Sequence, residues 1–324
     1  MRVVTVRVLT VLGIYTALAS SASAGTTYSF TPLLPPGMNG FIPFAITNSG
    51  VIVGDGISDS MSGQTPFIYA GGVWSTFSVP GAAPGFTTLT GVNSKGQIVG
   101  DYADTGYNFH GFFYDGSNFH TIDYPGASIT SVSGINNNGL IVGGAFSGST
   151  VLTTLGGFTY LNGTITPLPS QYGPAVGVND SGAIITQPTP NSSVGYLLQN
   201  NQATTISDPN AGIFGTSVHG INNSNVIVGG YVDPSGVDHG FIYNNGTYTT
   251  LDDPQSTYAG PGPVGANGEL TGINDLGQVV GDYLDANYDP QAFLATPIVP
   301  EPASLTLFSI AGCGAAVWKL RRRV

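Results

Sequence analysis

Aspartate is the residue type in this sequence with the widest chemical scope. Asp101 lies close to Asp104, and Asp282 lies close to Asp285 and Asp289, so oxygen ligands recur over short stretches of chain. Carboxylate oxygens suit Ca²⁺, and these two groups predict a weak calcium site assembled from several loops. Asp is also a common turn residue that solvates a surface with few lysines. Both interpretations stay open, because no segment has the Asp-x-Asp-x-Asp-Gly spacing of a calcium loop.

One histidine and three tyrosines offer binding chemistry of another kind. His219 occupies a position that Thr or Ser fills in related segments of the chain, which makes it a candidate for contact with a ligand. Tyr102, Tyr231 and Tyr283 share one position beside Asp and Asn residues. Such rings are typical of neutral-sugar sites, where the ring stacks on the apolar face of the sugar. The same rings could instead pack between repeated units, and this alternative is kept.

Motifs for catalysis are absent from the sequence. It contains no nucleophile elbow, HExxH zinc motif, phosphate-binding loop or dinucleotide fingerprint, and its one cysteine, Cys313, lies near the C-terminus. The sequence therefore favours a binding or structural protein over an enzyme. Two carboxyls from different segments could still form a pair that cleaves glycosides. A glycan-active hydrolase or lyase is thus the alternative, beside a passive structural spacer.

The charge distribution excludes one class of partner. The sequence has 18 acidic and 7 basic residues, a net charge of −11, and Lys95 is the only base between residues 25 and 298. A negative surface repels phosphate backbones, so nucleic-acid binding is excluded. Cations, neutral sugars and other proteins fit such a surface.

A repeat of about 43 residues fills the chain between its two ends. Each copy joins a turn of the Asn-x-x-Gly type to an apolar stretch related to Ile-Val-Gly. The copies are anchored at Asn48, Asn93, Asn136, Asn179, Asn222 and Asn274. In the second copy, residues 88–92, 97–102, 110–114 and 118–123 have the composition of short strands separated by turn residues.

Four strands per repeat predict an all-β fold, namely a six-bladed β-propeller over residues 25–298. The last copy lacks a fourth strand, and residues 28–33 carry the fourth-strand pattern. We therefore expect the N-terminal strand to complete the last blade and close the ring. The first strand of each blade would line a central channel, which places His219 there. A β-solenoid or a pair of β-sandwiches is the alternative architecture.

Both ends of the chain have the features of targeting segments. Residues 1–24 combine a basic start, an apolar core and the small-residue exit Ala22-Ser23-Ala24, as in a secretory signal peptide. Residues 299–324 contain a Pro-Glu-Pro motif, an apolar stretch over 303–318 that predicts a short transmembrane helix, and a basic cluster expected to stay in the cytoplasm. The residues of the motif and cluster are Pro300, Glu301, Pro302, Arg321, Arg322 and Arg323.

These segments resemble two bacterial families. The C-terminal segment resembles the PEP-CTERM sorting signal of Gram-negative bacteria, which implies processing by an exosortase and delivery to the cell surface or the exopolysaccharide matrix of a biofilm. The repeats resemble the extracellular HAF family, whose His-Ala-Phe triplet is approached by His110-Gly111-Phe112, His239-Gly240-Phe241 and Gln291-Ala292-Phe293. This second resemblance implies no reaction. The sequence thus predicts an exported, transiently membrane-anchored protein that binds matrix components, with neutral glycan and Ca²⁺ as candidate ligands.

Overall fold

The protein is described from a computed structural model, which covers residues 26–58, 63–148, 153–187, 193–254, 256, 268–285 and 290–298. The predicted signal peptide (1–24) and sorting signal (299–324), with the motif at Pro300, lie outside these residues. The chain divides into two units, Met1–Thr27 with Ile298–Val324, and Tyr28–Pro297. Within the described residues, no helix has the length and apolar character needed to cross a membrane.

The unit Tyr28–Pro297 is built from β-strands, and its described part has one short 3-10 helix, Ser170–Tyr172. The earlier strands are β1 Thr27–Leu33, β2 Gly40–Ile46, β3 Ile52–Ile57, β4 Thr65–Ala70, β5 Val73–Thr76, β6 Ala82–Val92, β7 Ile98–Asp104, β8 Phe109–Tyr114, β9 Phe119–Ile122, β10 Ile129–Ile135, β11 Ile141–Ser147 and β12 Thr153–Leu161. The later strands are β13 Thr164–Pro167, β14 Ala175–Val178, β15 Ile184–Thr186, β16 Gly195–Gln199, β17 Gln202–Ile206, β18 Thr216–Ile221, β19 Ile227–Val232, β20 Asp238–Asn244, β21 Thr247–Thr250, β22 Glu269–Ile273, β23 Val279–Leu284 and β24 Pro290–Ile298.

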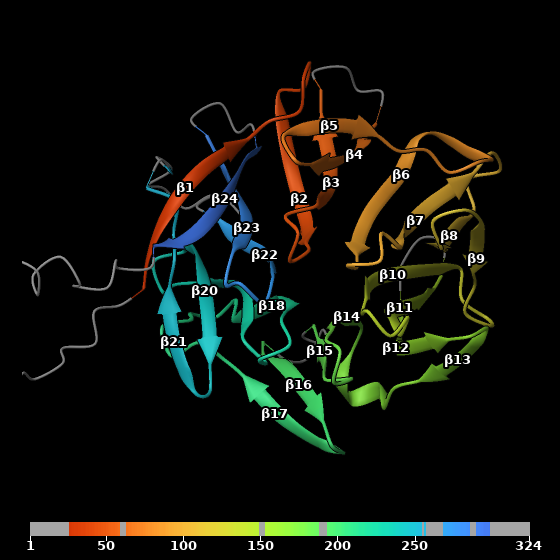
Figure 1. Ribbon diagram of the computed structural model, residues 1–324. Helices are drawn as coiled ribbons and strands as arrows, with labels where there is room; N and C mark the ends of the chain where they lie inside the picture. Colours follow the sequence, from red (N-terminus) through yellow and green to blue (C-terminus); the bar gives the residue numbers. More distant parts are fainter. Residues whose placement is uncertain are drawn as a thin grey trace, which may run out of the picture. The chain divides into compact units, whose positions relative to one another are not determined.

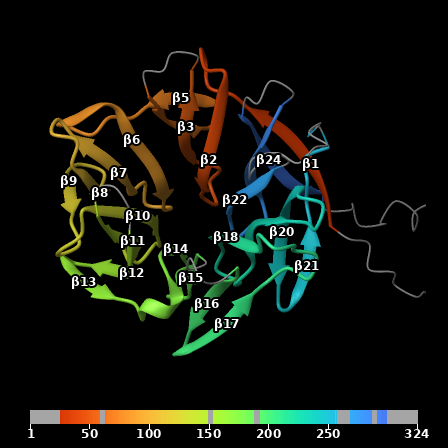
Figure 2. The same ribbon diagram turned by 180° about the vertical axis from the view of Figure 1, so that it is seen from behind.

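The strands form antiparallel sheets of four, in which sequence neighbours pair: β2 to β5, β14 to β17 and β18 to β21. A parallel contact between β8 and β10 joins two further sets of four, β6 to β9 and β10 to β13, and each set is treated below as a sheet of its own. The first strands β2, β6, β10, β14, β18 and β22 contact one another in that order, and β22 contacts β2 again. The sheets are therefore arranged around a common centre, as both views show (Figures 1 and 2).

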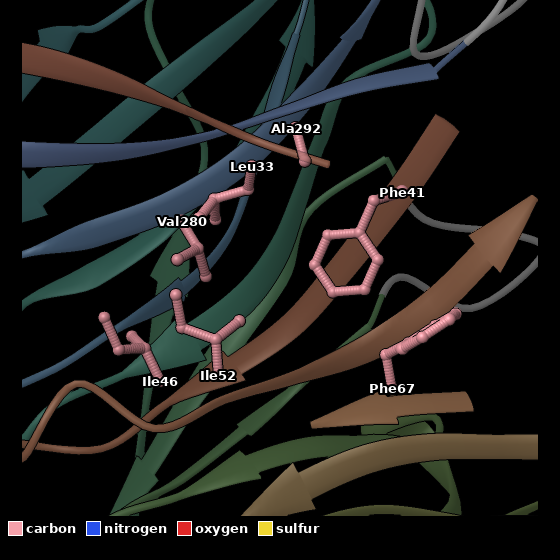
Figure 3. Close-up of a cluster of buried hydrophobic side chains, with 7 residues drawn as sticks. All are labelled: Leu33, Phe41, Ile46, Ile52, Phe67, Val280 and Ala292. Carbon is pink, nitrogen blue, oxygen red and sulfur yellow. The ribbon is translucent and has the colours of Figure 1, made fainter. Parts of the chain in front are cut away.

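The N-terminal strand β1 pairs with β24 at the outer edge of the last sheet, whose order is β1-β24-β23-β22. The sequence predicts this pairing. A buried cluster lies where the first and last sheets meet. It contains Leu33, Phe41, Ile46, Ile52, Phe67, Val280 and Ala292 (Figure 3). Hydrophobic packing therefore holds the two ends of the repeat array together.

Packing explains the glycine in the Ile-Val-Gly stretch of the repeat. In β11, a Cβ added to Gly143 would meet the backbone oxygen of Ser131 and would lie 2.8 Å from the ring of Phe158. Gly100, Gly229 and Gly281 stand in the same relation to the phenylalanine of their own third strand, at 2.8 to 2.9 Å. In these four repeats glycine therefore lets a third-strand aromatic ring pack directly on the second strand.

The Asn-x-x-Gly turns are hairpins between the first two strands of each sheet, as the sequence predicts. In the third repeat the Asn136 side-chain oxygen accepts hydrogen bonds from the backbone N–H groups of Asn138 and Leu140, at 3.0 and 2.9 Å. Gly139 then takes the positive φ of 81° that the turn requires.

The anchor of the first repeat is Thr47, which corrects the sequence assignment of Asn48. The Asn93 side-chain amide donates to the Asn136 backbone oxygen at 3.0 Å, and the same bond links each repeat to the next until Asn274 donates to the Thr47 oxygen at 3.0 Å. The intervening donors are Asn136, Asn179 and Asn222. Thr47 stands in this series, whereas Asn48 lies one position further on and pairs with Asp275.

Candidate functional site: a cavity in the channel

The first strands enclose a cavity of about 530 Å³, which we call the channel cavity. Each repeat contributes one residue from the same first-strand position. These residues are Phe44, Thr90, Ser133, Val176, His219 and Thr271. His219 therefore lies in the channel, where the sequence predicts it. The wall is completed by Ile42, Gln187, Glu269, Asp282, Leu284 and Pro290.

His219 and Glu269 face each other across neighbouring sheets. Nδ1 of His219 lies 3.2 Å from the Leu270 backbone oxygen, so this nitrogen carries a proton and donates it. Nε2 lies 3.7 Å from Oε2 of Glu269, and both side chains are about three-quarters buried. A neutral imidazole and a carboxylate would both present lone pairs here. A hydroxyl of a bound molecule could therefore donate to either side chain.

Asp282 occupies a position that also holds Asp in two other repeats, Asp55 and Asp101. Asp101 is tied to the next sheet, because its oxygens accept from the Ser131 hydroxyl at 2.8 Å and from the Val132 N–H at 2.7 Å. Burial raises the pKa of Asp101 to about 7 despite these two bonds. This carboxyl is fully engaged in joining two sheets.

Asp282 lacks the corresponding donors. The sheet that follows it begins at β2, where Ser131 is replaced by Ile42, which has no hydroxyl, and Val132 is replaced by Pro43, which has no backbone N–H. Within the described residues no hydrogen bond reaches the Asp282 carboxyl, which lines the channel cavity. Burial, with a smaller contribution from the charge of Glu269, raises the pKa of Asp282 to about 8.

The remainder of the wall combines hydroxyls with apolar side chains. Thr90 donates to the Val132 oxygen at 2.6 Å, and Gln187 donates to the Val218 oxygen at 2.8 Å. Phe44 and Val176 supply apolar surface between them. Apolar walls with a few converging polar groups are typical of small-molecule sites. Among the residues that the structure describes, neither lysine nor arginine lines this cavity.

The structure places the predicted tyrosines inside the sheets. Tyr231 and Tyr283 are only 6% and 7% exposed. Tyr102 and Tyr231 lie against His110 and His239, with ring centroids 5.2 and 5.0 Å apart, and their hydroxyls pair with threonines of the same repeat. These contacts correspond to the packing alternative. The exposed stacking surface expected of a sugar site is absent at Tyr231 and Tyr283.

The predicted calcium ligands have separate partners. Asp104 accepts from the N–H groups of Gly106 and Asn108 in its own turn, while Asp101 accepts from Ser131 and Val132 of the next sheet. Gln291 donates to Asp285 at 3.3 Å. Asp289 lies outside the described residues, and Asp282 belongs to the channel cavity. In the part of the chain that the structure describes, no three His, Cys, Asp or Glu side chains gather as a metal site.

Sequence reasoning missed Glu269 as a site residue and missed the role of Ile42 and Pro43. Glu269 stands where other repeats have Thr88, Ser131 or Ser217, so comparison of equivalent positions could have shown it as a departure from the repeat. The lack of donors at Asp282 depends on the contact between the last sheet and β2, which the sequence alone does not show.

Comparison with known proteins found no matching family model and no matching curated protein. Solved structures with a similar arrangement include a fungal protein, AofleA of Arthrobotrys oligospora in a mutant form, at 11% identity and a TM-score of 0.47, covering 87% of this chain and 93% of that one. A mutant of Aleuria aurantia lectin in complex with alpha-methyl-L-fucoside has 13% identity and a TM-score of 0.48, covering 86% and 97%. A subtype N11 neuraminidase-like protein from a bat influenza virus has 10% identity and a TM-score of 0.43, covering 86% and 96%. With TM-scores below 0.5, these likenesses do not identify a ligand for this chain.

Proposed function

We propose that this protein is an exported, six-bladed β-propeller, closed by its N-terminal strand, that binds a neutral polyhydroxylated ligand in the channel cavity. The cyclic contacts of the first strands and the pairing of β1 with β24 support the propeller architecture. The composition of residues 1–24 supports export. The preferred biological ligand is a neutral glycan of the cell envelope or biofilm matrix.

The observation that carries the binding proposal is the unengaged carboxyl of Asp282. A carboxyl with a pKa of about 8 holds its proton at neutral pH, so it can both donate and accept a hydrogen bond. Sugar hydroxyls need partners of both kinds. The cavity volume of about 530 Å³ lies within the usual range of roughly 300–1,000 Å³ for small-ligand sites.

The charge of the wall selects against anionic ligands. Glu269 and Asp282 are the ionisable acids of the cavity, His219 faces Glu269, and neither Lys nor Arg is present to bind a carboxylate or phosphate. A passive spacer would have no reason to keep unpaired polar groups in its channel, because unpaired buried polar groups destabilise a fold.

The test compares the wild-type chain with Asp282→Leu. Leucine removes the hydrogen-bonding groups at similar volume. We expect the affinity for exopolysaccharide from the producing cell, measured by co-sedimentation, to fall at least tenfold, and the melting temperature to stay unchanged. Asp104→Asn is the matched control, because Asp104 lies outside the cavity lining. Unchanged retention of Asp282→Leu would contradict the channel as the binding site.

A glycan-active enzyme is the second candidate, and one observation favours it. Such an enzyme would bring residues that depart from the repeat together in the channel, and Glu269 and His219 are departures of this kind that lie there beside the acid Asp282. A carboxyl that is protonated at neutral pH is suited to general-acid catalysis of glycosidic cleavage. Release of new sugar ends from exopolysaccharide, abolished in Asp282→Leu, would identify the enzyme. Retention without release would identify the binding protein.

Sorting and calcium are further parts of the proposal. The motif Pro300-Glu301-Pro302 and the cluster ending at Arg323 support processing by an exosortase, with delivery to the surface or matrix of a Gram-negative cell. Calcium is proposed as an auxiliary ligand of surface carboxylates such as Asp285. Intact-mass measurement of the secreted protein, with Glu301→Ala as the variant, tests processing. Retention assays with and without a chelator test calcium.

A further inference from the structure

A second cavity of about 430 Å³ lies between the first two sheets and involves none of the channel residues. Its wall contains Gln64, Phe86, Thr88, Asp101, Tyr102 and Phe109. We call it the aromatic groove. Tyr107 borders it through an edge-to-face contact with Phe86, the two ring centroids lying 5.4 Å apart.

The groove exists because β6 contains an insertion. Ala82 of β6 pairs with Asp104 of β7, and the next pair is Thr87 with Tyr102, so residues 83–86 have only one residue opposite them and leave the ladder. The corresponding strand β10 pairs with β11 without such an insertion. A bulge of this kind re-aims side chains, and here it carries Phe86 to the surface.

The rings of the groove remain open to solvent. Phe86 is 42% exposed, Phe109 is 41% exposed and Tyr107 is 63% exposed. Tyr107 also has a φ of 61°, in the left-handed region that non-glycine residues avoid, and its N–H is held by the Asp104 oxygen at 2.9 Å. Three exposed rings grouped at one bulge form an apolar surface that packing alone does not explain.

Polar groups lie beside these rings. The Gln64 side-chain oxygen accepts from the Thr88 hydroxyl at 3.3 Å. Within the described residues, no hydrogen bond uses the Gln64 amide nitrogen, which leaves two N–H donors available at the groove. The Asp101 oxygens are already engaged with the next sheet.

We propose that the aromatic groove is a second binding site, which takes one pyranose ring of a neutral glycan. Phe86 and Phe109 would contact the apolar C–H face of the sugar, and the Gln64 amide would donate to a hydroxyl. A purely apolar ligand would leave the amide without a partner, and an anionic sugar would find Asp101 but no base. This inference shares its ligand class with the proposed channel function and rests on separate residues.

The groove and the channel cavity lie on the same side of the ring. Leu284 ends β23 and Pro290 begins β24, while Gln64 precedes β4 and Phe109 begins β8, so both sites lie where second strands lead into third strands. A glycan chain long enough to reach both would bind with increased avidity.

The test is saturation-transfer NMR on the full chain with the methyl glycosides of glucose, galactose, mannose and fucose, and with methyl glucuronide as the charged comparator. We expect transfer to at least one neutral glycoside, at least tenfold weaker binding in Phe86→Ala, and weaker binding in Gln64→Leu. Phe214→Ala is the matched control, because Phe214 is 65% exposed and lies outside both cavities. The melting temperature of each variant shows that the fold is kept.

The two variants Asp282→Leu and Phe86→Ala distinguish binding in the channel cavity from binding in the aromatic groove. Binding that survives Asp282→Leu and is lost in Phe86→Ala supports the groove. Binding that survives Phe86→Ala and is lost in Asp282→Leu overturns the groove and supports the channel. Absence of transfer to any neutral glycoside in the wild-type chain, or stronger binding of the glucuronide, also overturns the groove proposal, whereas the exopolysaccharide assay on Asp282→Leu still decides the channel proposal.

Discussion

Three aspartates, which occupy the same position in three different repeats, have three different environments. Asp101 accepts two hydrogen bonds from the next sheet, Asp55 is fully buried beside Thr88 and Leu89, and Asp282 faces the channel cavity. The repeat sets the position of these side chains, but the neighbouring sheet sets their chemistry. This is why the sequence located acids of this type without showing which one is available to a ligand.

The buried carboxyl of Asp55 should make stability depend on pH. Burial raises its pKa to about 7, with Thr88 and Leu89 lowering it only in part, whereas the unfolded value is about 3.9. The folded state then holds more protons between these values, so the free energy of unfolding falls as the pH rises from about 4 to about 7. The slope is about 1.4 kcal/mol per pH unit for one such group. Urea unfolding at pH 5 and pH 7 should show a smaller difference in Asp55→Asn than in the wild type.

Asp104→Asn provides the control for this measurement. Hydrogen bonds from Asn108 lower the pKa of Asp104 to about 2. Its contribution to the free energy of unfolding is therefore complete above about pH 4 and is lost as the pH falls toward 2. The Asp104→Asn variant should therefore keep the wild-type difference between pH 5 and pH 7. An unchanged difference in Asp55→Asn would show that this carboxyl is ionised throughout the range.

At the scale of single elements, the second strands that contain the repeat glycine have no room for a side chain at that position. Gly143→Ala would place a methyl group against the Ser131 oxygen and the Phe158 ring. We expect a loss of about 1–3 kcal/mol of unfolding free energy, measured by chemical denaturation. Gly134→Ala in the preceding strand is the control, because its Cβ would meet its neighbours at 3.4 Å or more. Equal stability of the two variants would contradict the packing argument.

The turn asparagines form a chain of hydrogen bonds that passes from sheet to sheet and stops at one position. Thr47 accepts from Asn274 but has no amide to donate onward to the second repeat. Thr47→Asn should supply that missing donor and raise the unfolding free energy by about 0.5–1.5 kcal/mol. Thr47→Val should lower it instead, because the Thr47 hydroxyl accepts the Val51 N–H at 3.1 Å. Thermal unfolding of both variants tests the sign of the stability change. A lower stability of Thr47→Asn would contradict a stabilising role for the hydrogen bonds between the turn asparagines.

The strands themselves follow from the sequence more closely than their ends do. The four pieces predicted in the second repeat correspond to β6 to β9, but β6 begins at Ala82 because its insertion stays paired at the far end. The first repeat was aligned one residue out of place, since it has Thr47 at the anchor and Asn48 beside it. Local spacing predicts hairpins and their glycines. It does not predict which insertion bulges outward, because that depends on pairing with β7.

At the scale of the whole unit, the last sheet is completed by a strand from the opposite end of the sequence. Phe30 of β1 packs on Phe293 of β24 at 5.3 Å, and Leu33 belongs to the buried cluster shared with Phe41 (Figure 3). Deletion of residues 26–33 removes these contacts and leaves β24 as an open edge. The variant should melt at a lower temperature and self-associate in size-exclusion chromatography.

A peptide of residues 26–34 supplied separately should restore the melting temperature of this deletion variant by pairing with β24. A peptide with the same composition in scrambled order should not. If the deletion variant stays monomeric at the wild-type melting temperature, β1 contributes nothing to closure, and the sheets are held by their first strands alone.

The pairing of β1 with β24 also has a mechanical consequence. Ser29 bonds to Thr296, and Leu33 shares its cluster with Ala292, so the two strands run antiparallel and the chain enters and leaves the unit at one place. Tension applied between those two points would pull the strands apart as a zip opens, with one bond bearing the load at a time. The pairing of β1 with β24 would thus be the first part of the unit to break under force, and the remaining sheets would separate only after it.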